Sequence, residues 1–318
     1  MSRYPAFDAR QIRTQPLGER RSKVRVEDFA APPEPGRTVE AFLGSLPRIL
    51  SGTALMEIAA AVVAARRAGR AVVVSMGGHV VKTGMGRVLA ALLERGAITA
   101  CAVNGAFAIH DVEIALHGAT SEDVEEGLRT GLFGMARETA GLLNEGARIA
   151  CERGLGLGEA LGARLAEAPH AGASVLAAAH HACVPVTVHV GIGTDIVHMH
   201  PEADGAAIGA ASLRDFRILT HAMQDLAGGG VLMNLGSAVV LPEVLLKAIA
   251  TLRNVHGDAF SGFLGANFDF IQHYRSNQQV VSRVHGIGGW GIALTGHHEI
   301  LIPLLAQAIV DRWEAPAP

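Results

Sequence analysis

Apolar runs of strand length alternate with longer helical stretches from about residue 41 onward, and this alternation restricts the fold more than any other feature. Strands separated by helices pair in parallel, and the helices then cover both faces of the sheet. We therefore expect one α/β domain over residues 41–318, with a doubly wound, mostly parallel sheet. The expected strands are Ala71–Ser75, Ile98–Val103, Val184–Val188, Gly230–Leu235, Ala259–Gly265 and Gly291–Thr295. The expected helices are Thr53–Ala68, Gly84–Arg95, Ser121–Arg148, Gly158–Ala166, Ser174–Ala182, Asp204–Leu226, Pro242–Val255 and His297–Trp313.

Residues 1–40 have a different composition from the rest of the chain. They are rich in arginine and proline, include the run Pro32-Pro33-Glu34-Pro35-Gly36, and show no sustained periodicity. A segment of this kind cannot bury a core of its own. We expect an extended N-terminal arm over residues 1–40.

The overall composition excludes several classes of protein. Hydrophobic residues make up 49% of the 318 residues, too many for a disordered chain, yet no apolar run approaches the ~20 residues that span a bilayer. A net charge of −3 and an aromatic content of 4% do not suit a nucleic-acid partner. The three cysteines are isolated, and no secretory signal follows the N-terminal arginines. We expect a cytoplasmic protein with a small-molecule substrate and without a membrane or nucleic-acid partner.

Five expected strand ends run into Gly, Ser, Thr or Asn. In an open α/β sheet the carboxyl ends of the strands form the ligand crevice, where small residues let a ligand approach backbone N–H groups. Five such turns at strand ends predict a nucleotide-sized site, although no Walker A motif is present and no GxGxxG follows a strand. The five segments are Ser75–His79, Val103–Gly105, Gly191–Asp195, Leu235–Ser237 and Gly265–Asn267.

Histidines and carboxylates gather near the same strand ends. His198 and His200 flank Met199 just after Thr194-Asp195, which predicts a polar cluster beyond a strand. Four other histidines fall near strand ends: His79, His110, His297 and His298. A site of three histidines for a metal is therefore conceivable, but the spacing matches no established zinc motif, and we expect no metal.

Two further features have a functional and a structural interpretation. His110-Asp111 and Glu113 follow the Asn104-Gly105 turn, where a side chain could reach the crevice. Lys82 is the only lysine near the crevice, and it could hold a phosphate or an acidic substrate or be an ordinary exposed lysine.

Over residues 70–310 the order of several segments resembles the deoxyhypusine synthase family. The segments are Val103–Ala106 leading to His110–Val112, Ser174-Val175, Val184–Val186, Thr194-Asp195 with His200, Leu213–Arg217, Leu235–Val240 and Ile302–Leu305. The resemblance implies a doubly wound NAD-binding fold and a homotetramer with its sites at dimer interfaces. It also implies NAD-dependent oxidation of spermidine followed by transfer of its aminobutyl group.

One departure from the family changes the expected reaction. The family's imine-forming lysine corresponds to Leu241, and leucine cannot form a Schiff base. The family's acidic pair corresponds to Ile109 or His110 together with Asp111. We therefore expect the fold without deoxyhypusine synthesis, because a fold does not carry a function by itself.

The resemblance also implies the site residues. His200 takes the position of the family's catalytic histidine, which would accept a proton as a hydride leaves, and His110 and Asp111 complete the expected catalytic set. The expected NAD-contacting residues are Gly77, Gly78, Thr83, Asn104, Gly105, Gly193, Thr194, Asp195, Gly265, Asn267, Gly296 and His297.

Three functions follow as hypotheses. The first is a diverged NAD-dependent transferase or oxidoreductase that acts on an amine or another small polar substrate. The second is a metal-dependent hydrolase or lyase with His198 and His200 among the ligands. The third is a non-catalytic relative, which the loss of the lysine permits.

Overall fold

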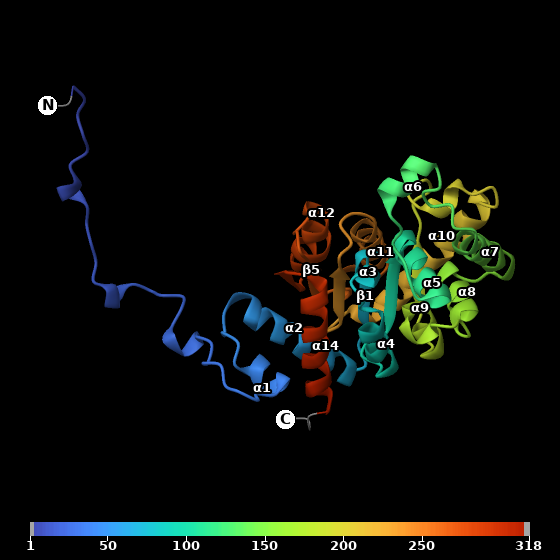
Figure 1. The fold of residues 1–318 in the computed structure, drawn as a ribbon. Coiled ribbons are helices and arrows are strands. Elements are labelled where there is room, and N and C mark those ends of the chain that lie inside the picture. The colour runs from blue at the N-terminus through green and yellow to red at the C-terminus, as the bar shows by residue number, and fades with distance from the viewer. Residues whose placement is uncertain (1–2, 315–318) are drawn as a thin grey trace.

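The computed structural model describes residues 3–314, and their strands form one six-stranded sheet (Figure 1). All five pairings are parallel, and the order is β3-β2-β1-β4-β5-β6. This order is that of a dinucleotide-binding Rossmann sheet. The predicted α/β, doubly wound class is confirmed. The strands are β1 Val72–Met76, β2 Ala100–Asn104, β3 Val186–His189, β4 Val231–Leu235, β5 Leu264–Asp269 and β6 Trp290–Thr295.

Helices cover both faces of the sheet, and each face has its own hydrophobic core. Alternate side chains of a strand point to opposite faces, so Val74 of β1 packs among α2, α4, α5 and α14, whereas Val73 packs against α10 and α11. Both faces are therefore apolar, as a fully buried parallel strand requires. The longer helices are α2 Leu50–Arg67, α4 Gly86–Glu94, α5 Gly105–His117, α7 Arg137–Arg153, α8 Leu157–Leu165, α10 Gly205–Ala222, α11 Val240–His256 and α14 His298–Glu314. The shorter ones are α1 Val39–Gly44, α3 His79–Lys82, α6 Val124–Thr130, α9 Val175–His181, α12 Tyr274–Ser276 and α13 Arg283–Gly286.

The outer edge of β3 is covered by side chains of α10. The carboxylate of Asp215 accepts the N–H of Val188 at 2.8 Å, and the hydroxyl of Ser212 accepts that of Val190 at 3.1 Å. Unpaired edge groups invite pairing with another chain, so these contacts protect the sheet from edge-to-edge association.

A row of polar side chains crosses the middle of the sheet near the carboxyl ends of its strands. Ser75, Asn234 and Asn267 lie at the same register on β1, β4 and β5, and all three are fully buried. Ser75 donates to Asn234 at 2.8 Å, and Asn234 donates to Asn267 at 2.7 Å. Asn267 donates in turn to Gln272, which donates to the carbonyl of Leu294 at 2.9 Å. The row ties together the strands that carry the crevice loops.

Five of the six expected strands are confirmed to within two residues at either end. The exception is the strand expected at Ala259–Gly265, because β5 begins only at Leu264 and runs to Asp269. Gly265 therefore lies at the amino-terminal end of β5, with its α-carbon against the carbonyl of Val280, and not in a crevice loop.

Two helix expectations were wrong. The single helix expected over Ser121–Arg148 is divided into α6 and α7, because Gly131 adopts a left-handed conformation that ends α6. The segment after Asn104, expected as a turn, begins the 13-residue helix α5 at Gly105. Asn104 caps this helix by accepting the N–H of Phe107 at 2.9 Å.

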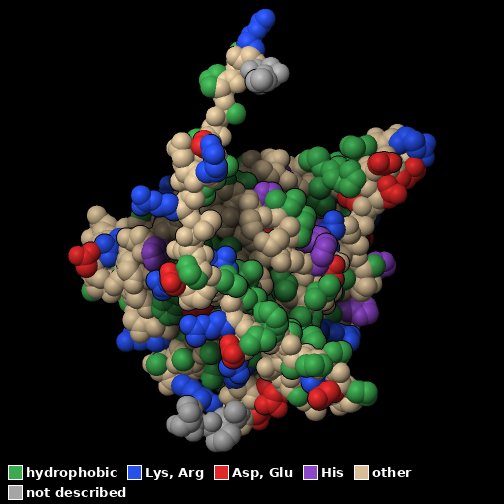
Figure 2. Space-filling view, turned by 90° about the vertical axis from the view of Figure 1, so that its left-hand side faces the viewer, with side chains coloured by type: hydrophobic (Ala, Val, Ile, Leu, Met, Phe, Trp, Pro, Cys, Tyr) green, Lys and Arg blue, Asp and Glu red, His purple; other side chains and the backbone are tan. Residues whose placement is uncertain are grey.

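The N-terminal segment stands away from the sheet as a narrow projection (Figures 1 and 2). From Arg3 to Thr38 it contains only three short 3-10 helices, and its larger apolar side chains are exposed. It rejoins the body through two hydrogen bonds, from Ala31 N–H to the carbonyl of Ser45 and from Arg48 N–H to that of Asp28. Among residues 3–314, no helix is both long and apolar enough to cross a membrane.

Candidate functional site

The strand order reverses between β1 and β4, and ligands of open α/β sheets bind at such a reversal. The loops that follow these two strands meet there. A Cβ added to Gly77 would lie 2.3 Å from the carbonyl oxygen of Gly236, so only glycine allows this close approach of the two backbones. Gly77 also donates its N–H to the carbonyl of Leu235 at 3.0 Å. The two loops are therefore packed backbone to backbone at the reversal, where the sequence predicts the crevice.

Imidazole and phenyl rings surround the reversal on the side of β5 and β6. His79 lies 5.3 Å from His298 and 5.5 Å from Phe270 between ring centroids, and His297 stacks on Phe270. Burial, His298 and Lys82 all lower the pKa of His79, which favours its neutral form. Flat rings of this kind suit a planar heterocycle.

His298 is fully buried beside Gly236, and one of its ring nitrogens is left without a partner. Its Nε2 lies 3.3 Å from the carbonyl oxygen of Phe268, which can only accept, so Nε2 carries the proton. Its Nδ1 then bears a lone pair and has no hydrogen-bond partner among residues 3–314. A buried acceptor without a donor is costly, and at this edge of the sheet it fits a ligand that supplies one.

A cavity of about 210 Å³ lies beside the crevice, at the carboxyl ends of β2 and β3. Its walls come from α3, α5, the segment that carries α6, and the loop after β3. The lining residues are Lys82, Ala106, Ile109, His110, Glu113, Ser121, Glu122, Val124, Phe133, Thr194, Asp195 and Ile196. A wider cavity of about 850 Å³ shares Glu113, Ser121 and Glu122 with it. Of the predicted site residues, the smaller cavity brings together His110 of α5 with Thr194 and Asp195 of the loop after β3.

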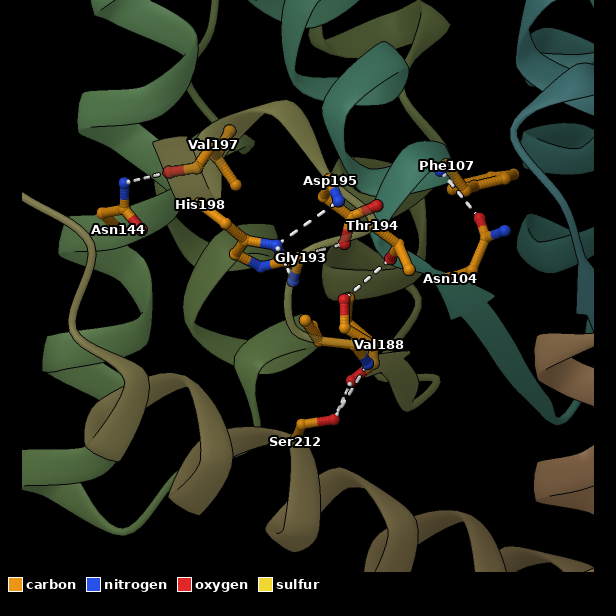
Figure 3. Close-up of polar contacts among 12 residues, drawn as sticks. Asn104, Phe107, Asn144, Val188, Gly193, Thr194, Asp195, Val197, His198 and Ser212 are labelled. Carbon is orange, nitrogen blue, oxygen red and sulfur yellow. Dashed lines mark hydrogen bonds and ion pairs between the residues drawn. The ribbon is translucent and has the colours of Figure 1, made fainter. Parts of the chain in front are cut away.

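Asp195 lies against the first turn of α5 (Figure 3). A Cβ on Gly105 would lie 1.9 Å from Oδ2 of Asp195, so the carboxylate occupies the space that a side chain there would fill. The amino-terminal end of a helix attracts negative charge. Burial raises the pKa of Asp195, while His198 and the Thr194 hydroxyl act in the opposite direction.

His198 holds the loop after β3 in shape. Its Nδ1 accepts the backbone N–H of Gly193 at 3.1 Å and that of Asp195 at 3.3 Å (Figure 3). Its Nε2 lies 4.0 Å from the carboxylate of Asp195, and both side chains are largely buried. Because both ring nitrogens are engaged within the loop, His198 orients Asp195.

His110 connects the crevice with the cavity. Its Cδ2 lies 3.1 Å from the position of a Cβ on Gly78, while its Nδ1 lies 2.7 Å from the hydroxyl of Thr120. That hydroxyl donates a very short hydrogen bond to Glu113. The hydroxyl therefore accepts from Nδ1–H, and Nε2 of His110 keeps its lone pair as a base.

Glu113 anchors this chain of hydrogen bonds. Burial alone would raise its pKa, but the nearby imidazole of His110 and the hydrogen bonds from Thr120 and Thr139 together lower the pKa of Glu113 below its usual value. Glu113 thus stays ionised and orients the base through Thr120.

The expected catalytic partner Asp111 does not face the cavity. It is fully buried and caps α9, where it accepts the hydroxyl of Ser174 at 2.6 Å and the N–H groups of Val175 and Leu176 at 2.8 and 3.0 Å. Burial raises the pKa of Asp111, and these hydrogen bonds partly offset the rise. Its position points to a structural role and not to the expected contact with a ligand.

His200 also lies outside the cavity lining. Its Nε2 lies 2.8 Å from the carbonyl oxygen of Gly134, and the N–H of Gly134 is bound by Glu122 at 2.9 Å. A Cβ on Gly134 would meet Ile196 and Met199 within 3 Å. His200 therefore holds the α6 segment against the loop after β3, while Glu122 ties the two ends of the α6 segment together.

The other expected cofactor residues divide into two groups. One group lies at the carboxyl edge of the sheet, in the loops or at the junction of β2 with α5: Gly77, Gly78, Asn104, Gly105, Gly193, Thr194, Asp195, Gly296 and His297. The others lie elsewhere: Gly265 at the start of β5, Asn267 within β5, with its side chain bound in the polar row, and Thr83 at the end of α3, with its hydroxyl bound to the carbonyl of Val80.

The sequence did not predict site roles for Thr120, which lines the wider cavity, or for Glu122, which lines both cavities. Glu122 belongs to an acidic run that suits the start of a helix, and Thr120 stands in a loop. A sequence signal for the base existed, because His110 and Glu113 are three residues apart and share a face once the segment is helical.

A metal site finds no support in the geometry. Within residues 3–314, no group of three or more His, Cys, Asp or Glu side chains is arranged to hold a metal ion. The metal hypothesis uses His198 and His200 as ligands, but His198 binds the backbone of its own loop at Gly193, and His200 binds the backbone of the α6 segment at Gly134.

Comparisons with known proteins agree with the fold. Residues 56–146 match the family model of the C-terminal Rossmann-fold domain of arginine dihydrolase ArgZ-like proteins. No curated protein matches the chain. ArgZ, an arginine dihydrolase from the ornithine–ammonia cycle in cyanobacteria, superposes with a TM-score of 0.52 at 17% identity over 83% of this chain and 33% of ArgZ. AgrE in its ternary complex with ornithine and NAD+ also gives 0.52, at 17% identity over 82% of this chain and 33% of AgrE.

The family-model match and the likenesses to ArgZ and AgrE are partial in length. The matched segment covers less than a third of the chain, and the chain spans about a third of ArgZ and AgrE. A structure described as a deoxyhypusine synthase, from Entamoeba histolytica, covers 87% of this chain and 94% of that one, at 10% identity and a TM-score of 0.48. The likenesses define the class of protein as Rossmann-like α/β, and the expected deoxyhypusine synthase relationship stays a prediction.

Proposed function

We propose that this protein is an NAD-dependent enzyme that acts on a small amine. The observation that carries the proposal is the meeting of two sites at one edge of the sheet. A Rossmann-type reversal with close-packed glycines lies directly beside a small cavity that contains a base and carboxylates. His110 touches both.

The residues at the reversal suit a dinucleotide. The loops around Gly77 and Gly236 allow backbone contact, the rings of His79 and Phe270 offer flat surfaces, and the unpartnered Nδ1 of His298 offers an acceptor. Bound NAD+ would supply a hydride acceptor for the carbon that bears the amine. AgrE was crystallised with NAD+ and ornithine, which supports this choice of cofactor and substrate class.

The cavity residues would bind the amine and manage its proton. Asp195 and Glu122 present carboxylates to an ammonium group, and Nε2 of His110 takes the proton that the amine loses. The clasped α6 segment, with Phe133 and Val124 on its inner side, would exclude water from the reacting atoms.

Deoxyhypusine synthesis does not belong to this proposal. Leu241 is fully buried in the core at the start of α11, so the position that corresponds to the family's lysine faces away from any ligand. After incubation with spermidine and NAD and reduction with borohydride, the protein mass should stay unchanged. A trapped aminobutyl adduct on Lys82 or Lys247 would contradict this part of the proposal.

Calorimetric titration with NAD+ tests the central claim. We expect micromolar or tighter binding and a higher melting temperature at saturating NAD+, because a ligand that binds only the folded state stabilises it. His79→Ala should weaken binding, whereas His256→Ala, at the far end of α11, should not. No heat and no thermal shift at millimolar NAD+ would remove the proposal.

A further inference from the structure

The carboxylates that line the cavity already have partners within the protein. Glu113 accepts from Thr120 and Thr139, Glu122 accepts the N–H of Gly134, and Asp195 is held by His198. Each is therefore fixed in place, and together they give the cavity an excess of negative charge.

Lys82 is the exception among the charged groups of this cavity. It is the only lysine or arginine in the lining, and its ammonium has no hydrogen-bond or ion-pair partner within residues 3–314. It stands at the end of α3, on the wall between the crevice and the cavity, close enough to His79 to act on that imidazole's pKa. Lys82 is exposed, so water solvates its ammonium in the empty cavity, and an anionic group of a ligand can replace that water as its partner.

We propose that Lys82 binds a carboxylate of the substrate, so that the cavity selects an amine that also carries a carboxylate group. This inference rests on the proposed function and names its substrate class. The ammonium of such a zwitterion faces Asp195 and Glu122, while its carboxylate faces Lys82.

Other ligands fit this charge pattern less well. A polyamine would place cationic groups against Lys82, and a dicarboxylate would place anionic ones against Glu113, Glu122 and Asp195. A cofactor phosphate would meet the same carboxylates, because Lys82 lines the cavity that they share. Opposite charges at two walls thus reject ligands whose charges are all of one sign.

The test uses pairs of probes that differ by one carboxylate. L-Ornithine and putrescine form one pair, and L-lysine and cadaverine form the other. Affinities are measured by calorimetry with and without NAD+ for the wild type, Lys82→Met, Lys82→Arg and the control Lys23→Met in the N-terminal segment. We expect at least one amino acid to bind roughly tenfold or more tightly than its decarboxylated partner, as for loss of a charged hydrogen bond. Lys82→Met should remove that preference, Lys82→Arg should keep most of it, and Lys23→Met should not change it.

The outcomes separate this inference from the proposed function. Equal affinities within both pairs, or a preference that survives in Lys82→Met, would overturn the role of Lys82. So would binding of NAD+ without binding of either amino acid, or a loss of NAD+ affinity alone in Lys82→Met, which would assign Lys82 to the cofactor phosphate. A carboxylate preference that depends on Lys82 in a protein that binds no NAD+ would support the inference and remove the proposed function.

Discussion

The tautomer of a single histidine decides which residue can act as the base. Thr120 must donate to the ionised Glu113, so its oxygen accepts from Nδ1 of His110 and leaves Nε2 unprotonated. His200, expected as the base, instead donates Nε2–H to the carbonyl of Gly134. One histidine therefore can act as a base and the other holds the backbone, because the hydrogen-bond partner of one ring nitrogen determines whether the other nitrogen carries a proton.

The different hydrogen bonds of His110 and His200 predict that replacing His110 lowers turnover more than replacing His200. With a substrate found by the binding experiments, His110→Ala should lower turnover by ~10²-fold or more while NAD+ affinity stays the same, since a general base is lost. His200→Ala should lower turnover less, because it loosens the α6 segment without removing the base. Turnover is followed as formation of reduced cofactor. A larger loss at His200 than at His110 would return the base to His200.

Asp215, which covers the edge of β3, should make stability depend on pH. Burial raises the pKa of Asp215 to about 7 in the folded protein, despite hydrogen bonds from Val188, Gly158 and Leu157. The folded state therefore holds this proton more tightly than the unfolded state. The resulting stabilisation is complete below the usual pKa of 3.8 and is lost as the pH rises through about 7.

Denaturant titrations between pH 5 and 8 check this prediction by comparing the wild type with Asp215→Asn. The asparagine carbonyl can take the place of Oδ2, which accepts both the Val188 and Gly158 N–H groups, and it cannot ionise. The wild type should lose stability relative to Asp215→Asn as the pH rises. A difference between the two that does not change over this range would contradict the raised pKa.

At the scale of elements, the start of α9 depends on a side chain from another helix. Asp111 of α5 accepts three hydrogen bonds at that end, including two from backbone N–H groups that the helix itself cannot satisfy. Asp204 serves α10 in a similar way, accepting the N–H groups of Ala206 and Ala207, but it belongs to that helix and is exposed. The two aspartates allow a buried cap between helices to be compared with an ordinary exposed one.

We expect Asp111→Ala to lower the free energy of unfolding by on the order of 3 kcal/mol, because it leaves several buried donors without an acceptor. Asp204→Ala should cost only about 1 kcal/mol, as for an exposed N-cap. Urea unfolding followed by circular dichroism measures both. If Asp111→Ala keeps full stability yet loses activity, Asp111 would regain the catalytic role expected from the sequence.

At the scale of the whole molecule, the N-terminal segment leaves apolar surface exposed. Phe7, Leu17, Val26 and Phe29 are each more than half exposed along a projection that touches the body only at its base. Exposed apolar side chains in such a projection suit contact with another copy of the chain. The division into an arm over residues 1–40 and one domain over residues 41–318 stays a prediction, as does the homotetramer.

Light scattering coupled to size exclusion should report a mass near four chains at micromolar concentration. Removal of residues 1–30 should lower this mass, because the arm would no longer reach a neighbouring subunit, while the melting behaviour of the body stays similar. A monomer mass for the full chain would refute the assembly. An unchanged tetramer without the arm would place the contacts elsewhere.

The class of fold and the edge of the sheet at which candidate ligand-binding residues lie could both be predicted from the residue pattern. Local periodicity distinguishes strands from helices, so the alternation of the two can be predicted from the sequence. Residues that follow parallel strands lie at the same edge of the sheet, and the pattern therefore places Gly77, Asn104 and Thr194-Asp195 at that edge. The boundaries failed where local signals were weak, as at β5, whose true extent depends on its pairing with β4 and β6.

The contacts among these residues follow from long-range packing and could not be predicted from the residue pattern. The strand order places β1 beside β4, although the paired residues of these two strands are more than 150 positions apart in the sequence. This pairing brings Gly77 next to Gly236. Adjacent residues of a helix point about 100° apart, which sends His110 to the cavity and Asp111 into the core. Packing of their loop brings Glu122 to the smaller cavity and Thr120 to the wider one, and it places Lys82 in a lining whose carboxylates come from other segments. Such convergence depends on contacts between distant segments, which local patterns do not encode.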